Sequence, residues 1–214
     1  MKKIGIFGSG VVAKVLGTGF IKHGHEVMLG TRDVAKLTDW QKQNPKGKVG
    51  STADTAAFGS ILVLAVKGTV AKQVLESAGS TNLKGKIIID ATNPISEAPP
   101  VNGVMNFFTD LKGSFMEQLQ TSYPDSRFVK AFNSVGSAFM VNPDFGGEKP
   151  TMFICGNNDD AKDEITNILT QFGWETEDMG KAEAARAIEP LCILWCIPGF
   201  LRNNWSHAFK LLKK

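Results

Sequence analysis

The chain has 214 residues, of which 43% are hydrophobic and 21% charged, and its formal net charge is +3. These values are typical of one globular domain, or of one domain with a short extension, and they exclude disordered and fibrous proteins. Lys and Arg do not gather into dense clusters interleaved with aromatic residues, so a nucleic-acid partner is not expected.

The N-terminus enters an apolar, β-branched run within a few residues and lacks the pattern of a signal peptide, so we expect a cytoplasmic protein. The odd count of three cysteines, Cys155, Cys192 and Cys196, indicates reduced core thiols and neither a disulfide framework nor a metal site. The apolar stretch 190–201 contains Pro198 and is shorter than a bilayer-spanning helix. We therefore expect a buried helix or a subunit interface there, and no membrane partner.

Short β-branched runs alternate with segments of helical character along the chain. The runs cover residues 3–8, 25–30, 61–66, 86–90, 127–131, 151–155 and 174–177. This alternation predicts an α/β fold of Rossmann type, with a doubly wound, mainly parallel sheet over residues 1–180. Residues 181–214 lack strand patterns and are expected to form a C-terminal helical extension, broken at Pro190 and Pro198 and packed on the same domain or on a dimer partner.

A glycine-rich turn follows the first run. Residues 8–13 read GSGVVA, which fits GxGxxA between a strand and an amphipathic helix. Gly8 permits the sharp turn, Gly10 lets the backbone approach a ligand, and Ala13 lets the helix pack close to the strand. Ser9, Gly10, Val11 and Val12 then offer free N–H groups at a helix N-terminus, where a pyrophosphate binds well.

The end of the second run distinguishes NAD from NADP, because an NAD site usually places a carboxylate there for the ribose 2′-hydroxyl. Thr31 and Arg32 stand at this point, and a hydroxyl with a guanidinium favours a 2′-phosphate. Asp33 is the alternative ribose ligand, although it is also well placed to cap the next helix. Lys36 is interpreted either as a second cation near the phosphate or as a solvated surface lysine.

Two further strand ends are expected at the same crevice, AVKGT at residues 65–69 and DATNP at residues 90–94. Asn93 precedes Pro94 and is held extended, so its amide can be directed toward a ribose or a nicotinamide. A plain turn is the other interpretation of this segment.

A catalytic acid for carbonyl reduction is hard to find. Tyr123 is followed by Pro124, and Arg127 replaces the lysine of a YxxxK pair. The histidines, His23, His25 and His207, are expected at the surface or in packing positions. Hydride transfer to a flavin-like ring needs no such acid, so the pattern favours that acceptor and predicts no catalytic acid or base on the protein.

IGIFGSGVVAKVL, GTRD, DATNP, KAFNSVGS, MFICGNNDDAK and AARAIEPL together resemble the NADP oxidoreductase family that includes NADPH-dependent reductases of the deazaflavin coenzyme. The cytosolic domains of the STEAP metalloreductases look similar. The resemblance implies NADP held by Ser9, Gly10, Val11, Val12, Thr31 and Arg32. It also implies that Ala65, Val66, Lys67, Asn93 and Asn133 line the nicotinamide side.

The leading interpretation is an NADP(H)-dependent reductase of a flavin or deazaflavin acceptor, with that small molecule as its redox partner. A carbonyl or imine reductase and a non-catalytic NADP sensor are the alternatives. A homodimer is expected because the C-terminal segment is strongly apolar. The residues that carry this expectation are Leu191, Ile193, Leu194, Trp195, Ile197, Phe200, Leu201 and Trp205.

Overall fold

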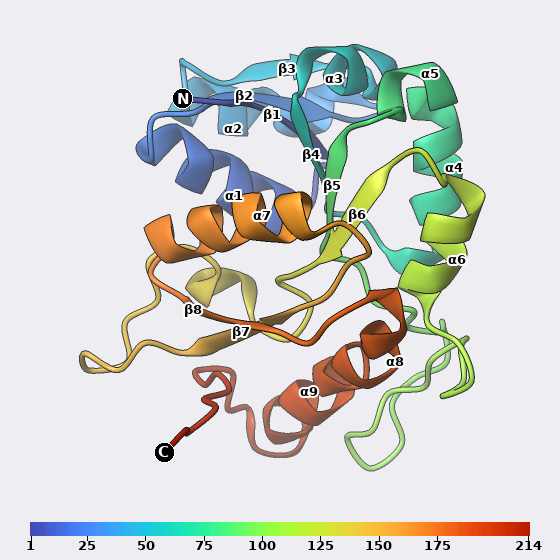
Figure 1. Ribbon diagram of the computed structural model, residues 1–214. Coiled ribbons are helices and arrows are strands. Elements are labelled where there is room, and N and C mark those ends of the chain that lie inside the picture. The colour runs from blue at the N-terminus through green and yellow to red at the C-terminus, as the bar shows by residue number, and fades with distance from the viewer.

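The computed structural model describes all residues from Met1 to Lys214 and is built around a six-stranded parallel sheet (Figure 1). The strand order is β3-β2-β1-β4-β5-β6, which confirms the predicted doubly wound α/β fold of Rossmann type. The strands are β1 (Lys3–Phe7), β2 (Glu26–Gly30), β3 (Lys48–Gly50), β4 (Ile61–Leu64), β5 (Ile87–Asp90) and β6 (Arg127–Lys130).

The register of the sheet aligns the carboxyl ends of its central strands. Phe7 of β1 pairs with Gly30 of β2 and with Leu64 of β4, Leu64 pairs with Asp90 of β5, and Asp90 pairs with Lys130 of β6. The loops that follow these strands therefore leave the sheet side by side at one edge, which is where open α/β sheets bind their ligands.

Helices cover both faces of the sheet, as Figure 1 shows. A core of 27 buried residues lies under α1 (Val11–Lys22) and α7 (Asp159–Gln171), and one of 17 lies on the opposite face under α4 (Gly68–Ala78) and α6 (Phe115–Ser122). β4 and β5 are buried along their whole length, as their apolar sequences predict. The shorter helices are η1 (Val34–Leu37), α2 (Thr38–Gln43), α3 (Thr52–Phe58), α5 (Ser80–Leu83), η2 (Ser137–Phe139) and η3 (Ala182–Ala184).

Three strands differ from the sequence prediction. β3 was not predicted, because its three residues between polar and glycine-rich flanks are too short to show a pattern. β7 (Thr151–Ile154) and β8 (Glu175–Asp178) form a separate two-stranded parallel sheet, joined to β6 only by an antiparallel bridge between Lys130 and Cys155. The β-branched pattern identifies strands but does not assign them to a sheet.

The C-terminal segment also departs from the expectation of a purely helical extension. α8 (Ala185–Ile188) is followed by α9 (Leu191–Arg202), and Pro198 lies inside α9 without ending it. Residues 203–214 are not helical, so the prediction for them was wrong, and they run back along β7, where Thr151 N donates to Phe209 O at 2.8 Å. His207 in this tail stacks on Trp195 with ring centroids 4.9 Å apart. The division at residue 180 stays a prediction.

The helical run Ala182–Arg202 is longer than the apolar stretch seen in the sequence. The run has 21 residues, and an 18-residue window within it has a mean hydropathy of 1.4, so by length and composition alone it could cross a membrane, contrary to the expectation from the shorter apolar stretch. Core helices of soluble proteins pass the same test, and Glu189 within the run is buried in ion pairs described below. The absence of a membrane partner stays a prediction.

Cys155 and Cys192 are buried free thiols and Cys196 is half-buried. Burial raises the pKa of Cys155 to about 12, so this thiol is protonated and inert at neutral pH. Cys155 and Cys192 therefore lie in the core as expected, whereas Cys196 is only half-buried.

An ion pair joins α6 to the C-terminal segment. Arg186 contacts Glu117 through Nη2–Oε1 at 2.6 Å and Nε–Oε2 at 3.0 Å, and Glu117 also completes a capping box with Ser114. The hydrogen bond from Arg186 lowers the pKa of Glu117 to about 2.

This pair predicts a pH dependence of stability. A carboxyl group whose pKa is lowered by folding stabilises the protein above its unfolded pKa of about 4.3, and that contribution is lost as the pH falls toward the folded value. The difference in free energy of unfolding between wild type and Glu117→Gln should therefore be largest near neutral pH and shrink between pH 4.5 and pH 2, as measured by denaturant titrations. A difference that stays constant over this range would contradict the assignment.

Candidate functional site

Two adjoining cavities of about 860 and 460 Å³ lie at the carboxyl edge of the sheet. The larger one is lined by Gly8, Ser9, Gly10, Val11, Val12, Arg32, Lys36, Ala65, Val66, Lys67, Gly68, Thr69, Val70, Ala91, Thr92, Asn93, Ile95, Ser96 and Glu97. The smaller one is lined by Gly8, Ser9, Gly30, Thr31, Arg32, Asp33, Lys36, Thr52, Val66, Val70, Gln73, Val74 and Ser77. Because the cavities share residues of the glycine turn and Arg32, they form one elongated site.

The glycine turn has the geometry that its sequence predicts. Gly8 has φ +135°, and a Cβ atom there would lie 2.4 Å from the carbonyl oxygen of Ala65, so only glycine fits. A Cβ on Gly10 would meet nothing within 4 Å, so this residue leaves the approach to the helix open. α1 begins at Val11 with Gly10 as its N-cap, and the N–H groups of its first turn have no helical partner. Ser9 precedes the helix.

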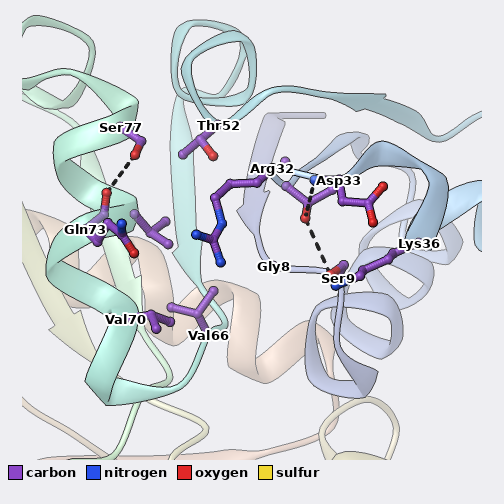
Figure 2. A pocket seen from close by; sticks show the side chains of 13 residues that line it. Gly8, Ser9, Arg32, Asp33, Lys36, Thr52, Val66, Val70, Gln73 and Ser77 are labelled. Atoms are coloured by element: carbon purple, nitrogen blue, oxygen red, sulfur yellow. Dashed lines mark hydrogen bonds between the residues drawn. The ribbon is translucent and has the colours of Figure 1, made fainter.

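The smaller cavity holds the residues that the sequence assigns to the adenosine end. Arg32 makes no ion pair, and Figure 2 shows its guanidinium extending into the cavity toward α4. Asp33 points away from that guanidinium, and its carboxylate accepts a hydrogen bond from Ala35 N at 3.2 Å as the cap of η1. Thr31 Oγ1 lies 3.5 Å from Ser9 Oγ, which links this strand end to the glycine turn. Lys36 lines both cavities, which supports its interpretation as a cation at the site.

Sequence reasoning missed the opposite wall of this cavity. This wall is formed by four residues of α4 and one of α3. The residues of α4 are Val70, Gln73, Val74 and Ser77, and the residue of α3 is Thr52. The sequence did contain one indication of this wall. Because α4 begins immediately after the strand end AVK, its first turns must lie at the carboxyl edge of the sheet.

The residues assigned to the nicotinamide side separate into two groups. Ala65, Val66, Lys67 and Asn93 line the larger cavity. Pro94 and Asn133 are not among its lining residues, and Asn133 is only 4% exposed.

Asn133 instead supports Asn93 from behind. Asn93 Nδ2 donates to Asn133 O at 2.7 Å, while Asn133 Nδ2 lies 3.2 Å from Asn93 Oδ1 and 2.9 Å from Ile188 O. Asn93 therefore lines the larger cavity, whereas Asn133 lies behind it and fixes its amide, and contact of either side chain with a ligand stays a prediction.

The titratable side chains that line the larger cavity are Arg32, Lys36, Lys67 and Glu97. Glu97 was missed, because it lies on the irregular segment between β5 and α6 where no pattern marks it, and it is exposed. The other candidate acids lie elsewhere: His23 lies 3.0 Å from Asn142, His25 contacts Gln171, and Tyr123 ends α6.

Several features of the site suit a dinucleotide that carries an extra phosphate. Arg32, Lys36 and Lys67 make no ion pairs within the chain, so their charges are available to phosphate groups. Ser96 Oγ is buried without a hydrogen-bond partner in the lining of the larger cavity, and the position beside Gly10 is open. The residues present therefore fit NADP(H).

Comparisons with known proteins agree with this geometry. Residues 3–94 match the family model described as NADP oxidoreductase, coenzyme F420-dependent. The F420-dependent NADP reductase of Methanothermobacter marburgensis is 28% identical over 195 residues, which cover 84% of this chain and 85% of that protein. A crystal structure from Arthrobacter sp. FB24, provisionally described as an F420-dependent NADP reductase, covers all of both chains with a TM-score of 0.93 and 28% identity.

The rat metalloreductase STEAP3 is 29% identical over 213 residues, which cover 93% of this chain. They cover only 39% of the metalloreductase, so the chain spans well under half the length of that relative. These matches confirm the resemblance seen in the sequence, and residues 3–94 match the model of the NADP oxidoreductase family.

Proposed function

We propose that this chain transfers a hydride between NADP(H) and a flavin or deazaflavin acceptor. The observation that carries the proposal is the elongated site, which has cations beside a glycine turn at one end and a fixed asparagine amide at the other. The relatives named as F420-dependent NADP reductases support the same class of acceptor.

The residues of the chain bind and orient, and the bound nucleotide supplies the hydride from its nicotinamide ring. The N–H groups at the start of α1 hold the pyrophosphate, and Thr31 with Arg32 holds the 2′-phosphate. Asn93, fixed by Asn133, orients the nicotinamide side. A flavin-type ring accepts a hydride without an acid from the protein, which agrees with the larger cavity, where the one lining carboxylate is the exposed Glu97.

The acceptor is tested by mixing the protein with NADPH and a panel of acceptors and following the absorbance of NADPH. Oxidation by FMN, FAD or a deazaflavin, and not by carbonyls or imines, is the expected result. Turnover with carbonyls or imines that is lost in Glu97→Gln would favour the alternative reductase, with Glu97 as its acid. Tight binding of NADPH without turnover on any acceptor would favour an NADP sensor.

Asn93→Ala should slow hydride transfer more than it weakens binding of the adenosine half, because Asn93 lines only the larger cavity, whereas the residues assigned to the adenosine half line the smaller one. We expect the rate of the saturated complex to fall about tenfold or more, the size of effect that a small misplacement of reacting groups produces. Binding of 2′,5′-ADP serves as the measurement for the adenosine half and should stay unchanged. An equal loss in the hydride-transfer rate and in the affinity for 2′,5′-ADP would contradict the assignment of Asn93 to the nicotinamide side.

We also propose that the protein is a homodimer through α9. Leu194 is 55% exposed and Leu201 53% exposed, and Val101 and Val104, on either side of the Gly103 that lies against Leu201, are exposed as well, so a partner on this side of the molecule would bury several apolar side chains. Trp195, in contrast, is buried within the monomer.

Light scattering at micromolar concentration should show a dimer for the wild type and a monomer for Leu194→Glu. Val34→Glu, at an exposed apolar residue on η1 and away from α9, should stay dimeric. A monomeric wild type would contradict the proposal. A cytoplasmic location and the absence of nucleic-acid partners stay predictions.

A further inference from the structure

A buried group of three charges lies behind the nicotinamide end of the site. Lys130 Nζ is 2.9 Å from Asp90 Oδ2, 3.0 Å from Glu189 Oε1 and 2.7 Å from the carbonyl oxygen of Thr92. The side chains of Lys130 and Asp90 are fully buried, and that of Glu189 is 2% exposed. The group joins the ends of β5 and β6 to the C-terminal segment.

Both carboxylates in this group are satisfied by further hydrogen bonds. Asp90 accepts from Thr92 N at 2.9 Å and from Thr92 Oγ1 at 2.7 Å. Glu189 accepts from Phe115 N and Met116 N, each at 3.0 Å, and so caps the N-terminus of α6. Burial alone would lower the pKa of Lys130, but attraction to Asp90 and Glu189 outweighs it and leaves the pKa raised, so the lysine is charged at neutral pH.

The group reaches the cavity by two short routes that both start in the C-terminal segment. In the first route, Lys130 Nζ donates hydrogen bonds both to Glu189 and to the carbonyl oxygen of Thr92. Thr92 in turn lines the larger cavity. The neighbouring Ile188 accepts a hydrogen bond from Asn133, which fixes Asn93 of the cavity lining.

The backbone before Asn133 is strained. Phe132 has φ +64°, a left-handed conformation that is uncommon for a bulky side chain, and it is almost fully buried. Such strain persists only where the surroundings over-determine it, and it is often found at functional sites. Phe132 lies between Lys130 and Asn133, so the strained turn connects the buried charged group to the asparagine that fixes Asn93.

We propose that Glu189 is a positioning residue, which holds residues 91–93 in the arrangement that orients the nicotinamide ring. This inference rests on the proposed function, because it concerns the same site. Loss of the Glu189 charge should therefore disturb the nicotinamide end of bound NADPH and leave the adenosine end unchanged.

The chain offers a matched control for a purely structural role. Glu117 also ties α6 to the C-terminal segment, through Arg186, but it makes no hydrogen bond or ion pair with Lys130, Asn93 or Asn133. Glu117→Gln should thus loosen the same two elements without moving residues 91–93.

The experiment compares Glu189→Gln with Glu117→Gln in the full chain. The measurements are the fluorescence lifetime of bound NADPH, the affinity for 2′,5′-ADP, and the single-turnover rate of hydride transfer. In Glu189→Gln we expect the lifetime to move toward that of free NADPH and the rate to fall about ten- to hundredfold, with 2′,5′-ADP affinity within about twofold of wild type. Glu117→Gln should match wild type in all three.

If Glu189→Gln does not fold, Asn133→Ala breaks the second route without unpairing a buried charge and should give the same lifetime change. A wild-type lifetime in Glu189→Gln, or equal changes in Glu189→Gln and Glu117→Gln, would overturn the inference alone. Failure of the wild type to bind NADPH would overturn both this inference and the proposed function.

Discussion

Lys130→Met should lower the free energy of unfolding by about 3–5 kcal/mol, the usual cost of removing one partner from a buried ion pair. The substitution leaves the carboxylates of Asp90 and Glu189 facing each other in the interior without their shared cation. Neither carboxylate has solvent access that would compensate for the lost charge. Denaturant titration at neutral pH measures this loss.

The control for this prediction is an ion pair at the surface. Lys2 lies 3.1 Å from Glu164, and its side chain is 45% exposed. Lys2→Met should change the free energy of unfolding by less than about 1 kcal/mol, because exposed pairs contribute little. A Lys130→Met protein as stable as Lys2→Met would contradict the buried network described here.

Arg32→Ala should weaken NADPH binding about ten- to hundredfold, because a hydrogen bond to a charged group contributes about 1.5–3 kcal/mol and 1.4 kcal/mol is tenfold in affinity. NADH binding should hardly change, since NADH lacks the 2′-phosphate. The loss should appear in binding and not in the hydride-transfer rate of the saturated complex, because Arg32 extends toward α4 in the smaller cavity, whose lining does not include Asn93. Equal losses for NADPH and NADH would show that Arg32 acts on another part of the nucleotide.

Salt gives an independent check on the same contact. Arg32 meets no carboxylate within the chain, so its contact with a phosphate is open to screening, with a Debye length of about 10 Å at 0.1 M salt. The preference of the wild type for NADPH should therefore shrink as the ionic strength rises. The preference of Arg32→Ala, being small, should hardly depend on salt.

The local signals in the sequence place Gly8, Thr31 and Arg32 at the carboxyl edge of the sheet, and all three line the smaller cavity. Gly8 and Thr31 directly follow β1 and β2, and Arg32 is the next residue, so these positions follow from the strand pattern and from the alignment of strand ends in a parallel sheet. Their contact with a nucleotide stays a prediction. Asp33 could be assigned to a capping role because capping depends only on neighbouring residues.

What could not be predicted depends on contacts between distant segments. Asn133 is placed behind Asn93 by its hydrogen bond to Ile188, 55 residues further along the chain, and no local pattern encodes that distance. Gln73 faces the site only because α4 packs across the sheet edge. Pro198 was expected to end a helix, but α9 continues through it and its last turn packs against Trp205.

A calorimetric titration of the wild-type protein with NADPH and with NADH at low salt tests the nucleotide preference of the site. We expect NADPH to bind at least about tenfold more tightly, because only NADPH places a phosphate beside Thr31 and Arg32. Equal affinity for the two nucleotides would contradict the assignment of Arg32 and would indicate Asp33 as the ribose ligand in its place.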